Sequence, residues 1–494
     1  MRFYTNAYYN YKGILLAEKD ENGKTVYSEK EHSPSVYLPS RDRCDLKSIN
    51  GEPLMRMKFD NHDQYKEFIE KYSTIPGFEI HGEIQQEYQF LAKHYGGNHN
   101  YDFSKIDIMY IDIETTSEKG FPSIDDPEEE VIVISVTSTK HGKATFCLGT
   151  YSTEENIKVF EYQTEDKLLK DFVKYFSDNY PDILSGWNIR FFDIPYLVNR
   201  IEKILGRKYV KMLSPWGIIK EKKINRRGKD ESAFDLVGIS TLDYYEVYKT
   251  FTYTNQESYS LNHISYVELG EKKLSYAEFE SITEFYKKDF QKFVQYNIRD
   301  VELVQKLEDK LRLIELAVAL AYSAGVNYTD VFSQVRTWDV IIYNDLLKRG
   351  IAVPPKKKAK KNEQYAGAYV KEPLVGFHDW VVSFDLNSLY PHLIMQFNIS
   401  PETMTPDGVR GTISPDCILN KLEHSNSFLV DMKNKNLSTA ANGTTYRKDI
   451  RGFLPDLMDN LYKDRKMFKN KMIESKKMLE DINEELRRRG LTND

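Results

Sequence analysis

Cysteine is scarce in this sequence: 494 residues contain 3, at positions 44, 147 and 417. Because they are odd in number and far apart, neither a disulfide framework nor a thiolate metal site is indicated, and a reducing cytoplasm is the expected compartment. Long apolar runs are also lacking. The N-terminal stretch MRFYTNAYYNYKG has no signal-peptide core. The stretch LIELAVALAY (313–322) contains Glu315, is too short to span a bilayer, and predicts a buried helix.

A general excess of positive charge is missing too. The net charge is −6, which argues against a uniformly basic nucleic-acid-binding surface but allows a local basic channel. Aromatic residues, in contrast, are abundant: 35 Tyr and 26 Phe supply large cores and surfaces on which bases could stack. The composition and length predict a globular protein with several domains.

Hydrophobic periodicity separates two types of region. Residues 1–104 alternate short aromatic strands with polar turns, whereas residues 105–330 alternate strand-like and helix-like segments, which predicts an α/β domain. In that domain IDIMYIDIE (106–114) and VIVISVTS (131–138) are apolar on both faces, as central strands are. The apolar spacing over 288–321 predicts a helix.

The last part of the sequence predicts a long helix over 455–489. Pro455 suits its first turn and Gly490 suits its end. Such a helix spans roughly 50 Å at about 1.5 Å per residue. Positions that step alternately by four and three from Leu461 to Leu486 are mostly apolar, a seam typical of helices that pack on a partner. No partner helix follows in the sequence, so the seam predicts a partner outside it.

Several acids stand where metal chemistry needs them. Asp112 and Glu114 lie two apart on a strand, so both point to one face at the strand's carboxyl end. Asp193 precedes a helix, and Tyr296 and Asp300 share one helix face. Taken one at a time, each has an ordinary structural explanation. Asp112 and Glu114 could be solvated acids at a strand end, Asp193 could cap a helix, and Tyr296 with Asp300 could be a tyrosine–acid pair at the edge of the core. Together they predict a two-metal phosphodiester hydrolase that binds two Mg²⁺ (or Mn²⁺) ions through oxygen ligands.

The stretch SFDLNSLYP (383–391) presents a single carboxylate. Val381, Val382 and Phe384 precede Asp385 and predict a buried strand that ends at this acid. A buried carboxylate is costly unless it meets a cation, and no second acid stands at a useful spacing. The stretch therefore predicts one half of a metal site.

These motifs together resemble family B DNA polymerases. DIE (112–114), NIRFFDIP (188–195) and YNIRD (296–300) are similar to the three exonuclease motifs of that family. SFDLNSLYP is similar to its first polymerase motif, and YAGA (365–368) to the tyrosine-glycine element between the two activities. Within the family, FTYTNQESYSLNHIS, VRTWDVIIYNDL and AYVKEP resemble the T-even-like phage polymerases.

The resemblance implies an α/β fold class, α+β overall, with a ribonuclease-H-like 3′→5′ exonuclease domain. The implied domains are a β-rich N-terminal domain (1–104), the exonuclease domain (105–330), a return segment and linker (331–373), an incomplete palm (374–452) and a first fingers helix (453–494).

The resemblance also implies residue roles. Asp112, Glu114, Asp193 and Asp300 would bind the exonuclease metal ions, and Tyr296 would orient the attacking water. For synthesis, Asp385 would bind a polymerase metal ion and Tyr390 would lie under the incoming sugar. The backbone of Ser388 and Leu389, with Arg465 and Lys469 four apart on one helix, would bind the triphosphate. Candidate DNA contacts are Asn188, Phe192, Arg227, Lys356, Lys357, Lys358, Tyr365 and Gly367.

Two basic segments have open interpretations. The lysine run after Pro355 is either a solvated loop or a set of phosphate contacts. Residues 220–244 predict a basic β-hairpin that turns near Arg227 and Gly228, and in similar polymerases such a hairpin helps to separate primer from template.

Two motifs of the family, KxxxNSxYG and YGDTDS, are missing from this sequence, as is the thumb. We therefore expect the N-terminal subunit of a split polymerase, whose C-terminal partner supplies the second polymerase acid and shares the polymerase-site ions. The alternatives are a stand-alone exonuclease with a relict palm, a non-enzymatic DNA-binding module, and a shortened piece of an intact polymerase. Expected partners are primer–template and single-stranded DNA, dNTP and, through the second subunit, a sliding clamp. No membrane association is expected, and the location would be the host cytoplasm for a phage protein.

Overall fold

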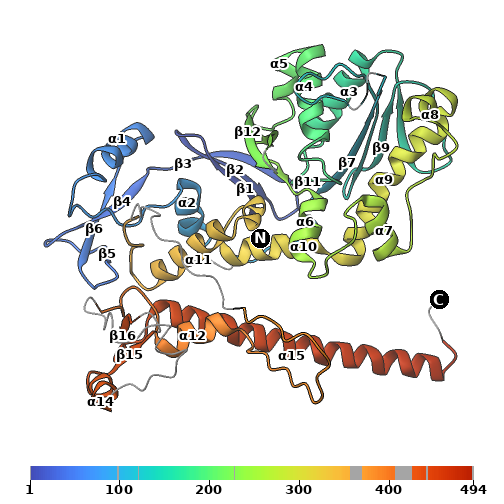
Figure 1. Cartoon of the computed structure of the whole chain (residues 1–494). Coiled ribbons are helices and arrows are strands. Elements are labelled where there is room, and N and C mark those ends of the chain that lie inside the picture. The colour runs from blue at the N-terminus through green and yellow to red at the C-terminus, as the bar shows by residue number, and fades with distance from the viewer. Residues whose placement is uncertain are drawn as a thin grey trace. The chain divides into compact units, whose positions relative to one another are not determined.

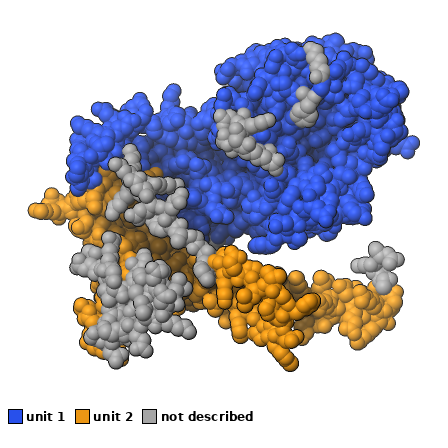
Figure 2. All heavy atoms as spheres, viewed as in Figure 1, with its two compact units in different colours: residues 1–36, 57–78, 82–344 blue, residues 37–56, 79–81, 345–494 orange. Residues whose placement is uncertain are grey.

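The structure is a computed structural model that describes residues 2–96, 99–118, 120, 122–226, 229–356, 370–405, 426–440 and 443–491. The chain forms two compact units (Figure 2). Unit 1 comprises residues 1–36, 57–78 and 82–344, and unit 2 comprises residues 37–56, 79–81 and 345–494.

A six-stranded mixed sheet lies at the centre of unit 1, with the strand order β10-β9-β8-β7-β11-β14. β7 pairs antiparallel with β8 and parallel with β11, so it is a central strand, as its apolar pattern predicts. Every residue of β8 is buried, which confirms the second predicted central strand. The strand bounds are β7 Ile108–Thr115, β8 Val131–Ser138, β9 Gly142–Cys147, β10 Ile157–Glu161, β11 Ile183–Ser185 and β14 Ser240–Thr241.

Helices pack on both faces of this sheet (Figure 1). α3 (Glu165–Asp178) and α4 (Asp193–Leu205) share one apolar core with alternate residues of β7, and α9 (Phe290–Leu311) packs on the other face. α10 (Leu313–Ala324) follows directly. The sequence predicts one helix here, but Arg312 adopts a left-handed φ of 53°. The carboxylate of Glu308 accepts hydrogen bonds from the backbone N–H groups of Ile314 and Glu315, which starts a new helix.

The remaining elements of unit 1 frame this domain. β1, β2 and β3 form an antiparallel sheet, in agreement with the aromatic strand pattern near the N-terminus. β12 and β13 form the predicted hairpin, while its turn at 227–228 lies outside the described residues. The bounds are β1 Phe3–Tyr9, β2 Gly13–Lys19, β3 Thr25–Glu31, α1 His62–Tyr72, α2 Gln86–His94, η1 Phe103–Lys105, α5 Arg207–Lys211, β12 Ile219–Arg226, β13 Lys229–Leu236, α6 Tyr244–Phe251, α7 Leu261–Leu269, α8 Ile282–Lys288 and η2 Tyr328–Phe332.

Unit 2 contains a small sheet, a hairpin and a long helix. The side-chain amide of Asn398 donates to the carbonyls of Arg447 and Ile450, and its oxygen accepts from the N–H of Gly452. These bonds join the end of α12 to the end of β16, the second strand of the β15–β16 hairpin, to the segment after it and to the start of α15. The bounds are β4 Ser35–Pro39, β5 Leu46–Lys47, β6 Pro53–Lys58, α12 Leu389–Phe397, α14 Asn426–Asn434, β15 Leu437–Thr439, β16 Thr445–Arg447 and α15 Phe453–Arg488. Three elements cross the boundary between the units: β4 and α11 (Gln334–Lys348) begin in unit 1, and β6 ends there.

Two predictions about unit 2 have opposite outcomes. The long C-terminal helix is confirmed: α15 has 36 residues. The buried strand before Asp385 is wrong. Residues 370–387 are irregular and exposed, with Val381 at 75% and Phe384 at 90% exposure. A strand needs a hydrogen-bonded neighbour, and none of the described residues pairs with this segment.

In the part of the chain that the structure describes, none of the helices combines the length and the apolar character that crossing a bilayer requires.

Candidate active site

The two-residue period of β7 determines which acids face α9. Ile111 and Ile113 pack into the core formed with α3 and α4. Asp112 and Glu114 therefore point to the opposite face, where α9 lies. α9 brings Tyr296, Asn297 and Asp300 to that face, and Asp300 is almost fully buried.

Three carboxylates meet at this position. One oxygen each from Asp112, Glu114 and Asp300 lies within 4.8 Å of the others. Asp193, the first residue of α4, is anchored beside them, because its Oδ1 accepts a hydrogen bond of 3.1 Å from the N–H of Ile113, between the two acids of β7. The structure thus brings together acids that are up to 188 positions apart in the sequence (300 − 112).

Two polar side chains that the sequence analysis did not single out hold this cluster. Asn297 Nδ2 donates to Asp112 Oδ2 at 2.7 Å. Lys273 Nζ pairs with Asp300 Oδ2 at 2.5 Å and lies 4.7 Å from the centroid of the Tyr296 ring. Asn297 stands inside the YNIRD motif and could have been noticed there. Lys273 lies in an irregular segment before α8, so no periodic pattern indicates it.

The acids titrate far from their ordinary range. Desolvation, followed by repulsion from Asp300, raises the pKa of Glu114 to about 8, and burial raises the pKa of Asp193 to about 7. The pKa of Asp112 is raised strongly by desolvation and then by Asp193 and Asp300. Burial raises the pKa of Asp300 to about 6, although Lys273 opposes the shift. Such like-charge crowding is stable only with protons or cations present.

Lys273 is the cation that the chain itself supplies. Burial lowers its pKa, but Asp300, Tyr296 and Asp112 raise it by more, so the net shift is upward. The same environment raises the pKa of Tyr296, with burial first and Asp300 second. At neutral pH Lys273 is therefore charged and Tyr296 is a neutral hydroxyl.

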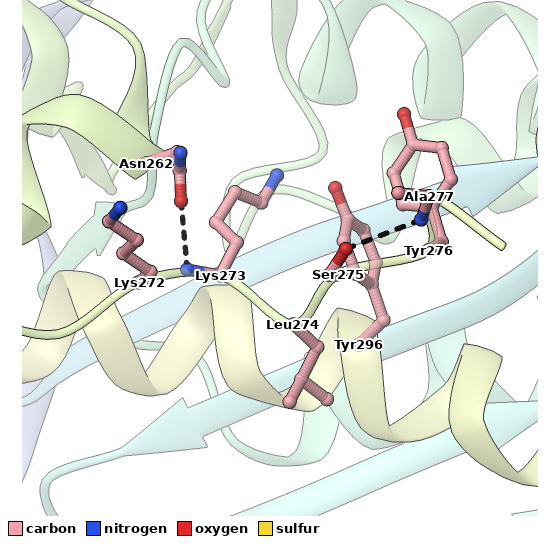
Figure 3. Close-up of a pocket in the computed structure, with 8 residues that line it drawn as sticks. All are labelled: Asn262, Lys272, Lys273, Leu274, Ser275, Tyr276, Ala277 and Tyr296. Carbon is pink, nitrogen blue, oxygen red and sulfur yellow. Dashed lines mark hydrogen bonds between the residues drawn. The ribbon is translucent and has the colours of Figure 1, made fainter.

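Two cavities open beside the cluster, and Lys273 lines both. The first, of about 370 Å³, is lined by Asp112, Trp187, Asn188, Tyr245, Tyr259, Ser260, Leu261, Lys273 and Asp300. The second, of about 490 Å³, is lined by Asn262, Tyr296 and residues 272–277 (Figure 3). The ammonium group of Lys273 and the hydroxyl of Tyr296 point to the same side of the loop in Figure 3.

The candidate DNA contacts have different positions. Asn188 lines the first cavity in a left-handed conformation with φ of 64°, and Phe192 stacks on Tyr196 with ring centroids 5.7 Å apart. Lys356 is exposed. Outside the described residues lie Arg227, Lys357, Lys358, Tyr365 and Gly367.

The predicted polymerase residues lie in unit 2. Arg465 Nη1 on α15 donates to Ser388 Oγ at 2.7 Å, so two residues 77 positions apart meet. Ser388 has a left-handed φ of 54° and precedes the first residue of α12, Leu389. Lys469 lies one turn after Arg465 on α15. Asp385 and Tyr390 are exposed, and the metal-type cluster of the described residues does not include Asp385.

Carboxylates from a strand and a helix of one α/β domain, two of which line the first cavity, define a candidate divalent-metal site. Oxygen ligands of this kind suit Mg²⁺. Two models of one protein family match the chain. Residues 79–264 match the exonuclease domain model of DNA polymerase family B, and residues 328–485 match the DNA polymerase family B model.

Similar curated proteins include two phage enzymes and a yeast enzyme. The DNA-directed DNA polymerase of Escherichia phage RB69 is 31% identical over 96% of this chain and 54% of its own length. That of Enterobacteria phage T4 is 29% identical over 92% of this chain and 52% of its own length. The DNA polymerase delta catalytic subunit of Schizosaccharomyces pombe is 27% identical over 73% of this chain and 33% of its own length.

The chain belongs to DNA polymerase family B, and its α/β domain is the exonuclease domain of that family. It spans about half the length of the two phage relatives.

Proposed function

We propose that the acid cluster of unit 1 is a 3′→5′ exodeoxyribonuclease site that hydrolyses DNA with two divalent metal ions. The observation that carries this proposal is the meeting of Asp112, Glu114 and Asp300 within 4.8 Å, with Asp193 anchored between the first two. Membership of the family supports the choice of DNA as substrate.

The residues at the cluster fit Mg²⁺ (or Mn²⁺). Asp300 Oδ1 is buried without a hydrogen-bond partner among the described residues. Burial and mutual repulsion raise the pKa values of Asp112 and Glu114 although Lys273 opposes both shifts, as expected where acids outnumber cations. Asp112, Glu114, Asp193 and Asp300 would hold the ions. When bound, the ions would polarise the scissile phosphate and activate water.

The protein residues would fix the geometry. Asn297 orients Asp112 through its 2.7 Å hydrogen bond, and the N–H of Ile113 orients Asp193. Tyr296, a neutral hydroxyl beside the cluster, would hold the attacking water in line. Lys273 keeps Asp300 ionised and offers a positive charge to the phosphate.

Unit 2 would contribute half of a DNA polymerase site. The contact between Arg465 and Ser388 supports a triphosphate site at the start of α12, to which Leu389, Tyr390 and Lys469 would add. Asp385 would bind a polymerase metal ion together with an acid that a second, C-terminal subunit supplies.

The exposed apolar side chains of unit 2 support that partner. Met472 and Leu479 on α15 are at least half exposed, as are Val382 and Phe384 beside Asp385. Large exposed apolar patches are typical of interaction sites, so these side chains support the proposal of a partner. The proposed partner carries the remaining palm, fingers and thumb and covers both segments. Primer–template DNA, dNTP and, through the partner, a sliding clamp would complete the assembly in the host cytoplasm.

Degradation of single-stranded DNA tests the nuclease proposal. The purified chain should shorten a 5′-labelled oligonucleotide stepwise in Mg²⁺ and release nucleoside 5′-monophosphates, with no cleavage in EDTA. A 3′-labelled strand should lose its label in the first step. Stable DNA under these conditions, or cleavage that is independent of divalent ions, would refute the two-metal nuclease.

A further inference from the structure

An aromatic and cationic group stands at the rim of the first cavity. Tyr245 and Tyr259 line this cavity, and their ring centroids are 6.3 Å apart at an interplanar angle of 78°. Lys249 Nζ lies 5.1 Å from the centroid of Tyr245 and 5.0 Å from that of Tyr259. The ammonium group is therefore held over both rings at once.

Local structure explains this arrangement. Tyr245 and Lys249 are four residues apart on α6, so they share one helix face. Tyr259 lies just before the start of α7, whose N-cap is Ser260. Lys249 is exposed, and its Nζ donates a hydrogen bond of 3.4 Å to the hydroxyl of Tyr245. Within the described part of the chain no carboxylate forms an ion pair with it. Its charge is therefore available to a ligand.

The rim is tied to the wall of the metal site through Asp243. This buried carboxylate accepts hydrogen bonds from the N–H groups of Asn188, Arg190 and Tyr245. Asn188 lines the same cavity as Asp112 and Asp300. A ligand that contacts the tyrosines is consequently held in a fixed register with the carboxylates.

We propose that Tyr245, Lys249 and Tyr259 form a binding platform for single-stranded DNA on the 5′ side of the bond that is cut. The exposed parts of the rings stack against bases, and Lys249 binds a backbone phosphate. Alternating aromatic rings and cations is how proteins bind single strands without reading sequence. This inference rests on the proposed nuclease function, because the strand's 3′ end must lie at the carboxylates.

The second cavity is the competing path for the strand, and its aromatic surfaces are less suitable. Its Tyr276 ring stacks on Phe285 at 13° and meets Tyr296 edge-on at 5.6 Å. Phe285 covers a ring face that a base would need, whereas the contacts of Tyr245 with Trp187 and of Tyr259 with Tyr248 are edge-on, at 80° and 70°. Lys272, at the edge of this cavity, lies 4.4 Å from the centroid of the Tyr266 ring. Lys272 is thus a matched control for Lys249: an exposed lysine over a tyrosine, beside the other cavity.

Salt-dependent binding separates the two paths. The probe is a fluorescein-labelled oligothymidylate of about 12 nucleotides, and its anisotropy is followed in EDTA, which prevents cleavage. Binding is measured across about 50 to 200 mM salt. Lys249→Ala should lower the slope of log Kobs against log salt by about 0.7, whereas Lys272→Ala should leave it unchanged.

Stacking is tested with a second pair of variants. Tyr245→Ala should weaken binding by roughly tenfold with an unchanged salt slope, and Tyr245→Phe, which keeps the ring, should retain most of the affinity. Thermal unfolding checks that the Tyr245→Ala variant is folded. If that variant is unfolded, the test depends on Lys249→Ala, which changes an exposed side chain.

The outcomes are distinguishable. The platform is overturned by any of three results for the slope of log Kobs against log salt. These are a fall for Lys272→Ala instead of Lys249→Ala, an equal fall for both variants, and no fall for either. A wild-type chain that binds no oligothymidylate at all refutes the proposed function itself.

Discussion

The two acid-bearing regions of this chain differ in what surrounds them. Asp112 and Asp300 are held by a strand, a helix, an asparagine and a lysine, and their oxygens lie within 4.8 Å together with Glu114. Asp385 follows an exposed, irregular segment and stands apart from any such cluster among the described residues. The difference shows that a carboxylate in the sequence does not by itself indicate a preformed cluster of oxygen ligands. If the proposed function is right, the chain should cut DNA by itself and should not extend a primer.

The largest expected effect comes from removing acids of the complete cluster. Asp112→Ala combined with Glu114→Ala should lower nuclease activity by on the order of 1000-fold or more, because two of the proposed metal ligands are lost. Steady-state release of nucleotides from single-stranded DNA measures this. Glu67→Ala with Glu70→Ala, on the exposed side of α1, is the matched control and should be neutral. Asp385→Ala should also leave the nuclease intact, and an equal loss there would remove the distinction between the two regions.

The contribution of apolar side chains to stability should also differ between the sheet of unit 1 and the segment before Asp385. Ile134 in β8 is fully buried, so Ile134→Ala should lower the free energy of unfolding by about 2–5 kcal/mol. Phe384, at 90% exposure, should change the free energy by less than about 0.5 kcal/mol when it becomes alanine. Urea unfolding of the two variants makes the comparison. A large destabilisation by Phe384→Ala would mean that the segment before Asp385 is packed in solution.

Divalent ions should stabilise unit 1 in a pH-dependent way. The folded-state pKa values of Glu114, Asp193 and Asp300 are about 8, 7 and 6, above those of unfolded acids. Between about pH 4 and pH 8 the folded state therefore binds more protons than the unfolded state, and without metal its stability should fall as pH rises.

Added Mg²⁺ replaces those protons, so its effect should be larger at about pH 8 than at about pH 6. At a free concentration of 100 times Kd the gain is about 2.7 kcal/mol. Thermal unfolding with Mg²⁺ and with EDTA measures it. The Asp112→Ala, Glu114→Ala chain should lose most of this gain, and a gain that persists in it would place the ion elsewhere.

Replacing Lys273 should have the smallest of these effects, and it should change the pH dependence of nuclease activity specifically. Lys273 opposes the rise in the pKa of Asp300, so Lys273→Ala should raise that pKa further. Nuclease activity near neutral pH should fall by roughly tenfold and recover toward alkaline pH. Lys273→Arg, which keeps the charge, should retain the original profile. A uniform loss at every pH would indicate a purely structural role.

Much of the nuclease domain was predictable because local periodicity and tertiary packing agree there. The two-residue period of β7 places Asp112 and Glu114 on one face, and the helical period of α9 places Tyr296 and Asp300 on another. The spacing of residues along the sequence could not show that this face of β7 and this face of α9 lie against each other. Their roles in catalysis remain predictions.

Other features depend on contacts between distant segments. Lys273 and Tyr259 lie in irregular segments, so no pattern marks them, although both line the first cavity. The break at Arg312 follows from side-chain capping by Glu308, which apolar spacing does not encode. The apolar run before Asp385 predicts a buried strand only if a neighbouring strand exists, and the described residues provide none.

Extension of a 5′-labelled primer on a template, with Mg²⁺ and all four dNTPs, tests the central claim most directly. The account predicts products that are shorter than the primer and no product that is longer. Longer products formed by this chain alone would show that Asp385 belongs to a complete polymerase site and would contradict the account.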